Sequence, residues 1–451
     1  MTPLELGLRR SSAARFSGVL RKLLLAREPG FAAVQSVVLQ FLTLGANLTT
    51  GVATARLLGP QGRGVYAAAT SWPSMLGLVA VAGLGQAVLV GLRRKPDLAP
   101  ATVAWAAAVA LVFSSLLAAA AYVLLPDLLG RGHSGGLDIA RVTLLMTYVV
   151  ASGALLQSIF GGRGQFLLAN LAMYLPHLIH AVAICAVVLA GRLTVVTAIG
   201  CLAFGNVAAQ IVLLPLALRG ACGPLRHVRA AGAALWSYGH RAATADLLAI
   251  CAEWSDRLIL IVLLAPRELG LYVVAYGFSR VVAVATPTNG LLLSAMAASD
   301  RATAKQIHDL SLRFCIAALA GASIVACTLS EPLIRIFYGV GFLQATATFQ
   351  ILVLQTSAAR IANVSALLYM VFDRPGLNSL FSVCGVAVSA VLMVVLTPAF
   401  GPPGAAVGLL AGSLIRLALL WIGLVTHLHV PLPQLRPSLL DLQAARMMFR
   451  A

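Results

Sequence analysis

Charged side chains recur inside the long apolar segments of this chain, where hydrocarbon makes an isolated charge costly. Four arginines lie deep in such segments: Arg257, Arg280, Arg360 and Arg416. A guanidinium group binds a phosphate or a carboxylate through two parallel hydrogen bonds, so arginines in a water-filled cavity suit an anionic ligand. Three more, Arg141, Arg241 and Arg313, lie where they can also extend to lipid head groups. The arginines outnumber the carboxylates of these segments, which predicts an anion-binding cavity.

The three carboxylates of the apolar segments occur close together, at Asp246, Glu253 and Asp256. Glu253 and Arg257 are four residues apart, the spacing at which opposite charges pair on a helix. The sequence therefore predicts a Glu253–Arg257 ion pair. The carboxylates are expected either to neutralise arginines in this way or to couple transport to an ion gradient.

Two apolar segments carry a stripe of polar side chains at helical spacing. The stripe in the first segment consists of Ser36, Gln40, Thr43, Asn47 and Thr50. The stripe in the fifth consists of Arg163, Asn170, Tyr174 and His177. Such stripes suit the wall of a water-filled cavity, although polar side chains also join neighbouring helices in membranes. Two stripes in one half of the chain favour the cavity.

The sequence contains no arrangement typical of an enzyme or of a cofactor site. There is no Gly-x-x-x-x-Gly-Lys-Ser/Thr run for nucleotide phosphates. His177 and His180 are better explained by packing than by metal binding, and the cysteines show no paired spacing. The chain is therefore expected to be a transporter without a metal or a cofactor.

The elements that must position these residues are membrane-spanning helices. The chain has 451 residues, of which 60% are hydrophobic and 10% charged, whereas soluble domains average about 25% charged residues. Its apolar runs are long enough to cross roughly 30 Å of hydrocarbon. They predict an all-α polytopic membrane protein with twelve spans, at about 31–53, 64–90, 100–125, 140–160, 166–189, 194–217, 234–264, 269–297, 310–329, 347–371, 377–400 and 404–426.

A sequence repeat divides the spans into two sets of six. Leu57, Leu58, Pro60, Gly64, Tyr66 and Ala69 recur 206 residues later as Leu263, Leu264, Pro266, Gly270, Tyr272 and Ala275. An even number of spans per copy makes the copies parallel, and such repeats commonly enclose a transport site. The predicted parts are a basic segment 1–30, a lobe 31–217, a linker 218–233, a lobe 234–426 and a tail 427–451.

The net charge of +18 is unevenly distributed over the loops. Nineteen basic residues fall on the side of the termini and six on the other side. The excess of positive charge in cytoplasmic loops places both termini in the cytoplasm. The loops are too short for a nucleic-acid-binding domain, so no nucleic acid partner is expected.

The repeated junctions also resemble a known family. The first junction is Ala55–Pro60 followed by Gly64–Ala69, the second is Asp256–Leu260 followed by Leu269–Tyr272, and a third is Pro332–Arg335 with Gly341-Phe342. They are similar to helix junctions of bacterial polysaccharide and O-antigen flippases. These flippases belong to the multidrug/oligosaccharidyl-lipid/polysaccharide exporter superfamily, and the resemblance covers nearly the whole chain.

The resemblance implies two six-helix lobes around a central cavity in the inner membrane. It also implies that a polyprenyl-diphosphate-linked oligosaccharide moves from the cytoplasmic to the periplasmic leaflet by alternating access. Arg257, Arg280, Arg360 and Arg416 would neutralise the diphosphate. The polar residues Gln40, Asn47, Arg163, Asn170 and Tyr174 would contact the sugar. Membrane lipids and other polysaccharide-assembly proteins would be further partners.

Two alternatives stay open from the sequence. The first is a cation-coupled exporter of drugs or metabolites from the same superfamily, although a positively charged cavity disfavours cationic drugs. The second is a membrane glycosyltransferase or polysaccharide polymerase, which usually has larger external loops. Flippases of the peptidoglycan precursor carry charges in their first helix, whereas residues 31–53 here have none.

Overall fold

The computed structural model describes residues 29–128, 137–219, 228–286 and 289–433. The predicted basic segment 1–30 lies almost wholly outside these residues, as do parts of the predicted linker 218–233 and tail 427–451. The described residues form helices joined by short connections, without a strand. This confirms the predicted all-α fold class.

Contacts divide the chain into two compact units. The first unit holds the described residues up to Thr50, with Pro73–Tyr122 and Val142–Leu247. The second holds Gly51–Trp72 and the described parts of Val123–Arg141 and Leu248–Ala451. This division differs from the predicted lobes 31–217 and 234–426. Gly51–Trp72 and the described part of Val123–Arg141 belong to the second unit, and residues 234–247 belong to the first.

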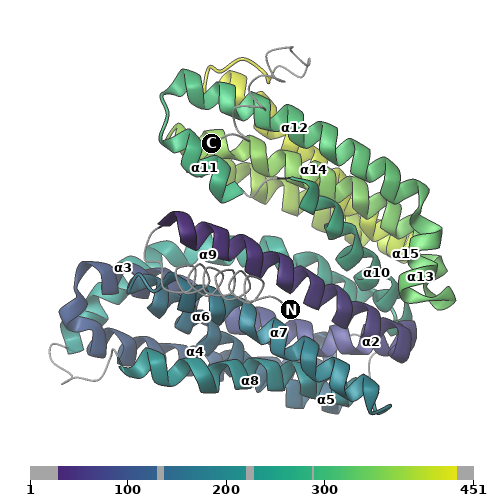
Figure 1. Cartoon of the computed structure of the whole chain (residues 1–451), viewed down its shortest axis with the longest axis horizontal. Helices are drawn as coiled ribbons and strands as arrows, with labels where there is room; N and C mark the ends of the chain where they lie inside the picture. Colours follow the sequence, from purple (N-terminus) through teal and green to yellow (C-terminus); the bar gives the residue numbers. More distant parts are fainter. Residues whose placement is uncertain (1–28, 129–136, 220–227, 287–288, 434–451) are drawn as a thin grey trace, which may run out of the picture. The chain divides into compact units, whose positions relative to one another are not determined.

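The helices of the first unit pack around α6, which contacts α3, α7 and α8 (Figure 1). Their bounds are α3 (Leu84–Arg94), η1 (Pro96–Leu98), α4 (Ala99–Leu128), α6 (Met146–Gly162), α7 (Phe166–Leu189), α8 (Val195–Arg219) and α9 (Val228–Leu263). Only the part of α4 up to Tyr122 and the part of α9 up to Leu247 belong to this unit. Val88, Leu156 and Phe160 are buried in the core of this unit.

In the second unit α14 contacts both α12 and α15. Its helices are α5 (Leu137–Thr143) up to Arg141, α9 from Leu248, α10 (Pro266–Ser279), η3 (Arg280–Ala285), α11 (Asn289–Ala297), α12 (Arg301–Thr328), α13 (Ser330–Tyr338), η4 (Val340–Ala345), α14 (Thr346–Val371) and α15 (Pro375–Thr426). Leu367, Leu368 and Tyr369 of α14 are buried, and the Tyr369 hydroxyl donates to the carbonyl of Leu420 at 2.6 Å. This hydrogen bond satisfies a polar group that would otherwise be costly in hydrocarbon.

Helices cover the stretches of the predicted spans, but α9, which contains the predicted seventh span 234–264, is not among the described helices that are apolar enough to cross a membrane. Eight are long and apolar enough to cross a membrane, and nine if the bent pair Val38–Ala80 and Leu84–Arg94 is one span. Two of the helices hold two predicted spans each. α2 (Pro29–Ala80) bends at Gly59 and α15 bends at Gly401, and both glycines have a positive φ. Each is followed by proline, which cannot extend the preceding helix, so Gly-Pro separates the merged spans.

Three predicted spans are interrupted. The fourth, 140–160, is divided between α5 and α6 by a turn at residues 144–145. The second, 64–90, breaks between α2 and α3, where Gly83 has a φ of 72°. The eighth, 269–297, is divided into α10, η3 and α11. Its break follows from Pro287, because a residue before proline avoids the helical region and Thr286 is extended. α13 was not predicted, because its nine residues are too few for a span.

The two copies of the repeat meet within the second unit. A Cβ atom added to Gly64 would lie 1.7 Å from the carbonyl oxygen of Pro266. A Cβ atom added to Gly270 would lie 1.9 Å from the carbonyl oxygen of Pro60. Only glycine permits this approach. The repeated Pro-x-x-x-Gly spacing is therefore explained by a reciprocal backbone contact between the copies.

Candidate functional site

The eighth span changes from an α-helix to a 3-10 helix at Arg280. α10 ends at Ser279, and η3 covers Arg280–Ala285 before the chain becomes extended at Thr286. Irregular backbone within a membrane span is tolerated only where it is buried in protein or lines a cavity. Arg280 is exposed at this break. The break thus marks a place where an ion or a charged ligand can bind.

Arg257 of α9 and Arg280 both contact the ring of Tyr276. The guanidinium carbon of Arg257 lies 5.2 Å from the Tyr276 centroid and 5.0 Å from the Trp254 ring. The guanidinium carbon of Arg280 lies 5.5 Å from the Tyr276 centroid. Its Nη1 also donates to the Tyr276 hydroxyl over 3.4 Å. Cation–π contacts of this kind stabilise an arginine by about 0.5–2 kcal/mol and leave most of its N–H groups for a ligand.

Asp256 supports the same cluster from the side of α9. Its Oδ2 accepts a hydrogen bond of 3.2 Å from the Tyr272 hydroxyl, and both side chains are buried. The ring of Tyr272 stacks on Tyr276, with centroids 6.0 Å apart. The negative charge of Asp256 acts on both Arg257 and Arg280. Asp256 therefore offsets part of the positive charge and fixes the position of the two tyrosines.

The predicted Glu253–Arg257 ion pair is not formed among the described side chains. Glu253 is exposed, whereas the guanidinium of Arg257 rests on the rings of Trp254 and Tyr276. Spacing along α9 allows the pair, but the aromatic faces compete for the same guanidinium.

The two other predicted arginines are held by protein oxygen atoms. Arg360 of α14 donates to Thr286 Oγ1 from Nε at 3.2 Å and from Nη2 at 3.0 Å, so it holds the end of η3. Arg416 of α15 donates from Nη1 to Asn363 Oδ1 at 2.9 Å, and its Nε is buried without a hydrogen-bond partner in the described part of the chain. Arg360 is close enough to Arg280 for their charges to interact, whereas Arg416 forms a separate pair.

The prediction that Asp246 pairs with an arginine is replaced by a different contact. Asp246 Oδ2 accepts a 2.9 Å hydrogen bond from the backbone N–H of Gly83. Gly83 immediately precedes α3, whose first N–H groups have no partner within the helix. The carboxylate therefore caps α3 at the break in the second span. A lone carboxylate 163 residues from its partner gives no signal of this in the sequence.

The structure places the residues of the predicted polar stripes in different surroundings. Gln40 and Asn47 are exposed on α2, and Asn170 and Tyr174 are partly buried on α7. Arg163 does not belong to α7. It lies in the turn after α6, since Gly164 with a φ of 70° separates the two helices, and its Nη1 donates to the carbonyl of Ala217 at 2.7 Å.

The sequence did not identify Trp254, Tyr276 or Arg63 as site residues. Tyr276 precedes Arg280 by four residues and Trp254 precedes Arg257 by three, so helical spacing could have indicated both contacts. Arg63 of α2 lies over the Tyr66 ring at 5.0 Å, and its charge acts on Arg257. Its position just after Pro60, outside the predicted apolar run, gave no such signal.

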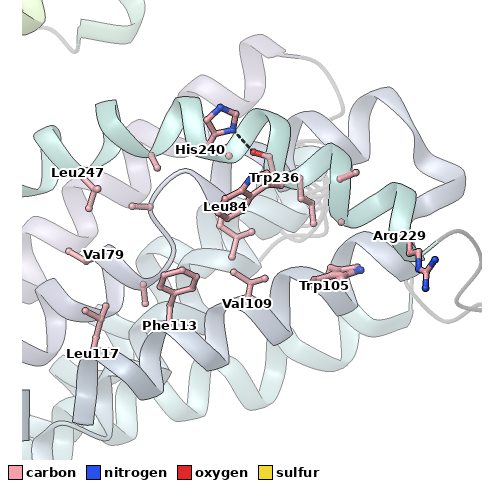
Figure 2. A pocket seen from close by; sticks show the side chains of 17 residues that line it. Val79, Leu84, Trp105, Val109, Phe113, Leu117, Arg229, Trp236, His240 and Leu247 are labelled. Atoms are coloured by element: carbon pink, nitrogen blue, oxygen red, sulfur yellow. Dashed lines mark hydrogen bonds between the residues drawn. The ribbon is translucent and has the colours of Figure 1, made fainter. Parts of the chain in front are cut away.

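An apolar pocket of about 790 Å³ lies in the first unit. Figure 2 shows Trp105, Val109, Phe113 and Leu117 along one face of α4 and His240 on α9. The ring nitrogen Nδ1 of His240 is hydrogen-bonded to the carbonyl of Trp236 at 2.7 Å. Most of the side chains that line the pocket are apolar, so it suits a hydrocarbon chain better than a sugar.

Comparisons with known proteins agree with this architecture. The structure is similar to that of "Lipid II flippase MurJ, inward closed conformation", with a TM-score of 0.71, 15% identity, and coverage of 87% of this chain and 88% of that chain. It is also similar to the "Inward-facing conformation of a multidrug resistance MATE family transporter of the MOP superfamily", with a TM-score of 0.65, 15% identity, and coverage of 87% and 96%. At these identities the likeness establishes the fold.

The sequence comparisons identify the family to which the chain belongs. No curated protein sequence matches this one. Residues 53–347 match the family described as "Polysaccharide biosynthesis protein". This match covers more than half of the chain and includes α10, Arg257 of α9 and Arg280 of η3. The chain therefore belongs to the polysaccharide biosynthesis protein family.

Proposed function

We propose that this protein is a flippase that moves a polyprenyl-diphosphate-linked oligosaccharide from the cytoplasmic to the periplasmic leaflet by alternating access. The observation that supports it most is the placement of Arg257 and Arg280 on the ring of Tyr276 at a broken helix. A diphosphate offers several oxygen atoms to two guanidinium groups. The aromatic rings of Trp254 and Tyr276 beside these arginines suit a sugar. The family and the fold are compatible with this activity.

The proposal includes the cellular setting. The protein would lie in the bacterial inner membrane with both termini in the cytoplasm and serve O-antigen or a related surface polysaccharide. Reporter fusions after residues 130, 192 and 402 should then report the periplasm, and fusions after residues 96, 225 and 451 the cytoplasm. A periplasmic signal from the last fusion contradicts this topology.

A second candidate, a cation-coupled exporter, is favoured by the likeness to the multidrug transporter. The exposed Glu253 and the buried Asp256 could bind a coupling cation in either case. Two arginines with unused donors favour an anionic substrate over a cationic drug. We therefore assign the carboxylates to charge compensation or ion coupling and the arginines to the substrate.

A vesicle assay separates the two candidates. The purified protein is reconstituted with a fluorescent polyprenyl-diphosphate-linked oligosaccharide, and the labelled lipid in the outer leaflet is quenched over time. We expect protein-dependent exchange between leaflets, and no protein-dependent movement of a cationic dye loaded into matched vesicles. Dye movement driven by a proton or sodium gradient, without exchange of the lipid, would instead establish the exporter.

A further inference from the structure

A second group of arginines surrounds a cavity at one end of the first unit. Arg93 lies in the last turn of α3, Arg163 lies between α6 and α7, and Arg219 ends α8. All three line a cavity of about 810 Å³, named here the arginine pocket. Its described lining includes no carboxylate. Three positive charges from three separate segments therefore converge without an acidic side chain to balance them.

Two of these arginines are fixed in place by helix ends. Arg93 Nη2 donates to the carbonyl of Gly161 at 3.1 Å, and Arg163 Nη1 donates to that of Ala217 at 2.7 Å. The second amino nitrogen of Arg163, Nη2, is buried and has no hydrogen-bond partner among the residues that the structure describes. Burial also lowers the pKa of the Arg163 guanidinium. An unsatisfied buried donor is costly, so an acceptor placed in the pocket would bind favourably.

The start of α7 adds further donors to the pocket. Gln165 and Phe166 line it, and Gln165 precedes the first turn of this 24-residue helix without capping it through its side chain. That turn contains no acidic residue. The first N–H groups of a helix and its dipole attract an anion, and phosphate is a common one. The arginines and the helix thus favour the same kind of ligand.

We propose that the arginine pocket binds the phosphate of an anionic phospholipid. Leu92, Phe166 and Leu216 line the pocket beside the arginines, so it offers apolar contacts to the glycerol and upper acyl region of a lipid. The pocket lies at the ends of membrane helices, where lipid head groups are, and basic pockets between such helices bind anionic head groups. The proposed topology places it at the cytoplasmic leaflet. The site is distinct from the Arg257–Tyr276–Arg280 cluster of the second unit.

Native mass spectrometry of the whole protein with defined lipids tests this proposal. Phosphatidylglycerol is the anionic probe and phosphatidylcholine the neutral one. Arg219→Gln is the main variant, because Arg219 is exposed and its loss should not disturb folding. Arg163→Gln is the second. Arg94→Gln is the matched control, because Arg94 is the next arginine on α3 and does not line the pocket.

We expect Arg219→Gln and Arg163→Gln each to weaken phosphatidylglycerol binding about tenfold or more, since each removes a charge-assisted hydrogen bond. Arg94→Gln should bind as the wild type does. Equal binding by Arg219→Gln and Arg94→Gln, or equal binding of phosphatidylcholine, overturns the proposal. Displacement of phosphatidylglycerol by inorganic phosphate at matched concentration shows a free-anion site and also overturns it.

A polyprenyl diphosphate competitor separates this site from the substrate site. If the competitor removes phosphatidylglycerol from the wild type and from Arg280→Ala alike, the pocket binds substrate and the lipid assignment fails. The readout is binding, not transport, so failure of the proposed flippase activity leaves the result unaffected.

Discussion

Three arginines of the second unit are held in two different ways. Arg257 and Arg280 rest on the rings of Tyr276 and Trp254, whereas Arg416 bonds to the amide oxygen of Asn363 on a neighbouring helix. A ring stabilises the charge through its face and leaves the N–H groups unused. An amide oxygen occupies an N–H group directly. An arginine on a ring is thus prepared for a ligand, whereas one bonded to an amide mainly joins two helices.

Removing a ring-held arginine should give the largest effect. Arg257→Ala or Arg280→Ala is expected to lower the transport rate at least about a hundredfold, because charge-assisted contacts to the diphosphate are lost. Arg280→Lys should recover only part of the rate, since an ammonium group cannot form the bidentate contact. Rates are measured in vesicles and normalised to folded protein.

The matched control for this pair is Arg335→Ala. Arg335 is exposed on α13 and paired with Glu331 at 3.0 Å, so its loss should leave the rate unchanged. Wild-type rates in both Arg257→Ala and Arg280→Ala would show that the ring-held arginines do not contact the substrate.

The amide-bonded arginine should affect stability more than transport. Arg416→Ala leaves Asn363 without its partner, and we expect the free energy of unfolding to fall by about 1–3 kcal/mol. Transport per folded molecule should stay within about threefold of the wild type. Thermal unfolding in detergent and the vesicle assay measure the two quantities. Full stability with lost transport would instead place Arg416 among the substrate contacts.

The ring of Tyr276 should matter more than its hydroxyl. Tyr276→Leu removes the ring that contacts two guanidinium groups and should lower transport about thirtyfold, in line with roughly 1 kcal/mol for each of the two contacts. Tyr276→Phe keeps the ring and loses only the long contact to Arg280, so it should stay within about threefold. Equal damage by both changes would mean that the hydroxyl, not the ring, positions the arginines.

Glu253 should give the smallest effect. It is exposed and not paired with Arg257, so Glu253→Gln is expected to change folded yield and transport less than about twofold. The loss caused by Arg257→Ala should be the same with and without Glu253→Gln. A rescue of Arg257→Ala by the second change would show that the two charges pair during transport. A large effect of Glu253→Gln alone would favour ion coupling at this carboxylate.

The sequence predicted the features that depend on neighbouring residues along the chain. Spans follow from the length of apolar runs, and the fifth, 166–189, agrees with α7 at both ends. Breaks at Gly59 and Gly401 follow from Gly-Pro. Partners across space were not predictable in the same way. Arg360 meets Thr286 across 74 residues, and Arg163 meets Ala217 across 54. Spacing on one helix does not report such partners.

The same limit explains why the roles of Asp246 and Arg163 differ from those predicted. Asp246 caps α3 because the helix breaks at Gly83. This break lies within a continuous apolar run, and the glycine is the only residue there that indicates it. Arg163 belongs to a turn because Gly164 takes a positive φ there. In both places one glycine decides whether a polar side chain faces a cavity or satisfies a helix end.

The contact of Gly64 with Pro266, mirrored by that of Gly270 with Pro60, has the form of an isologous interface, in which a patch meets a copy of itself. Such interfaces usually join the identical subunits of a dimer. Here both partners belong to one chain, as expected if two half-length subunits once paired through this motif and were later fused. Each glycine must still fit the proline carbonyl of the other copy, so the motifs are constrained to change together although 206 residues separate them.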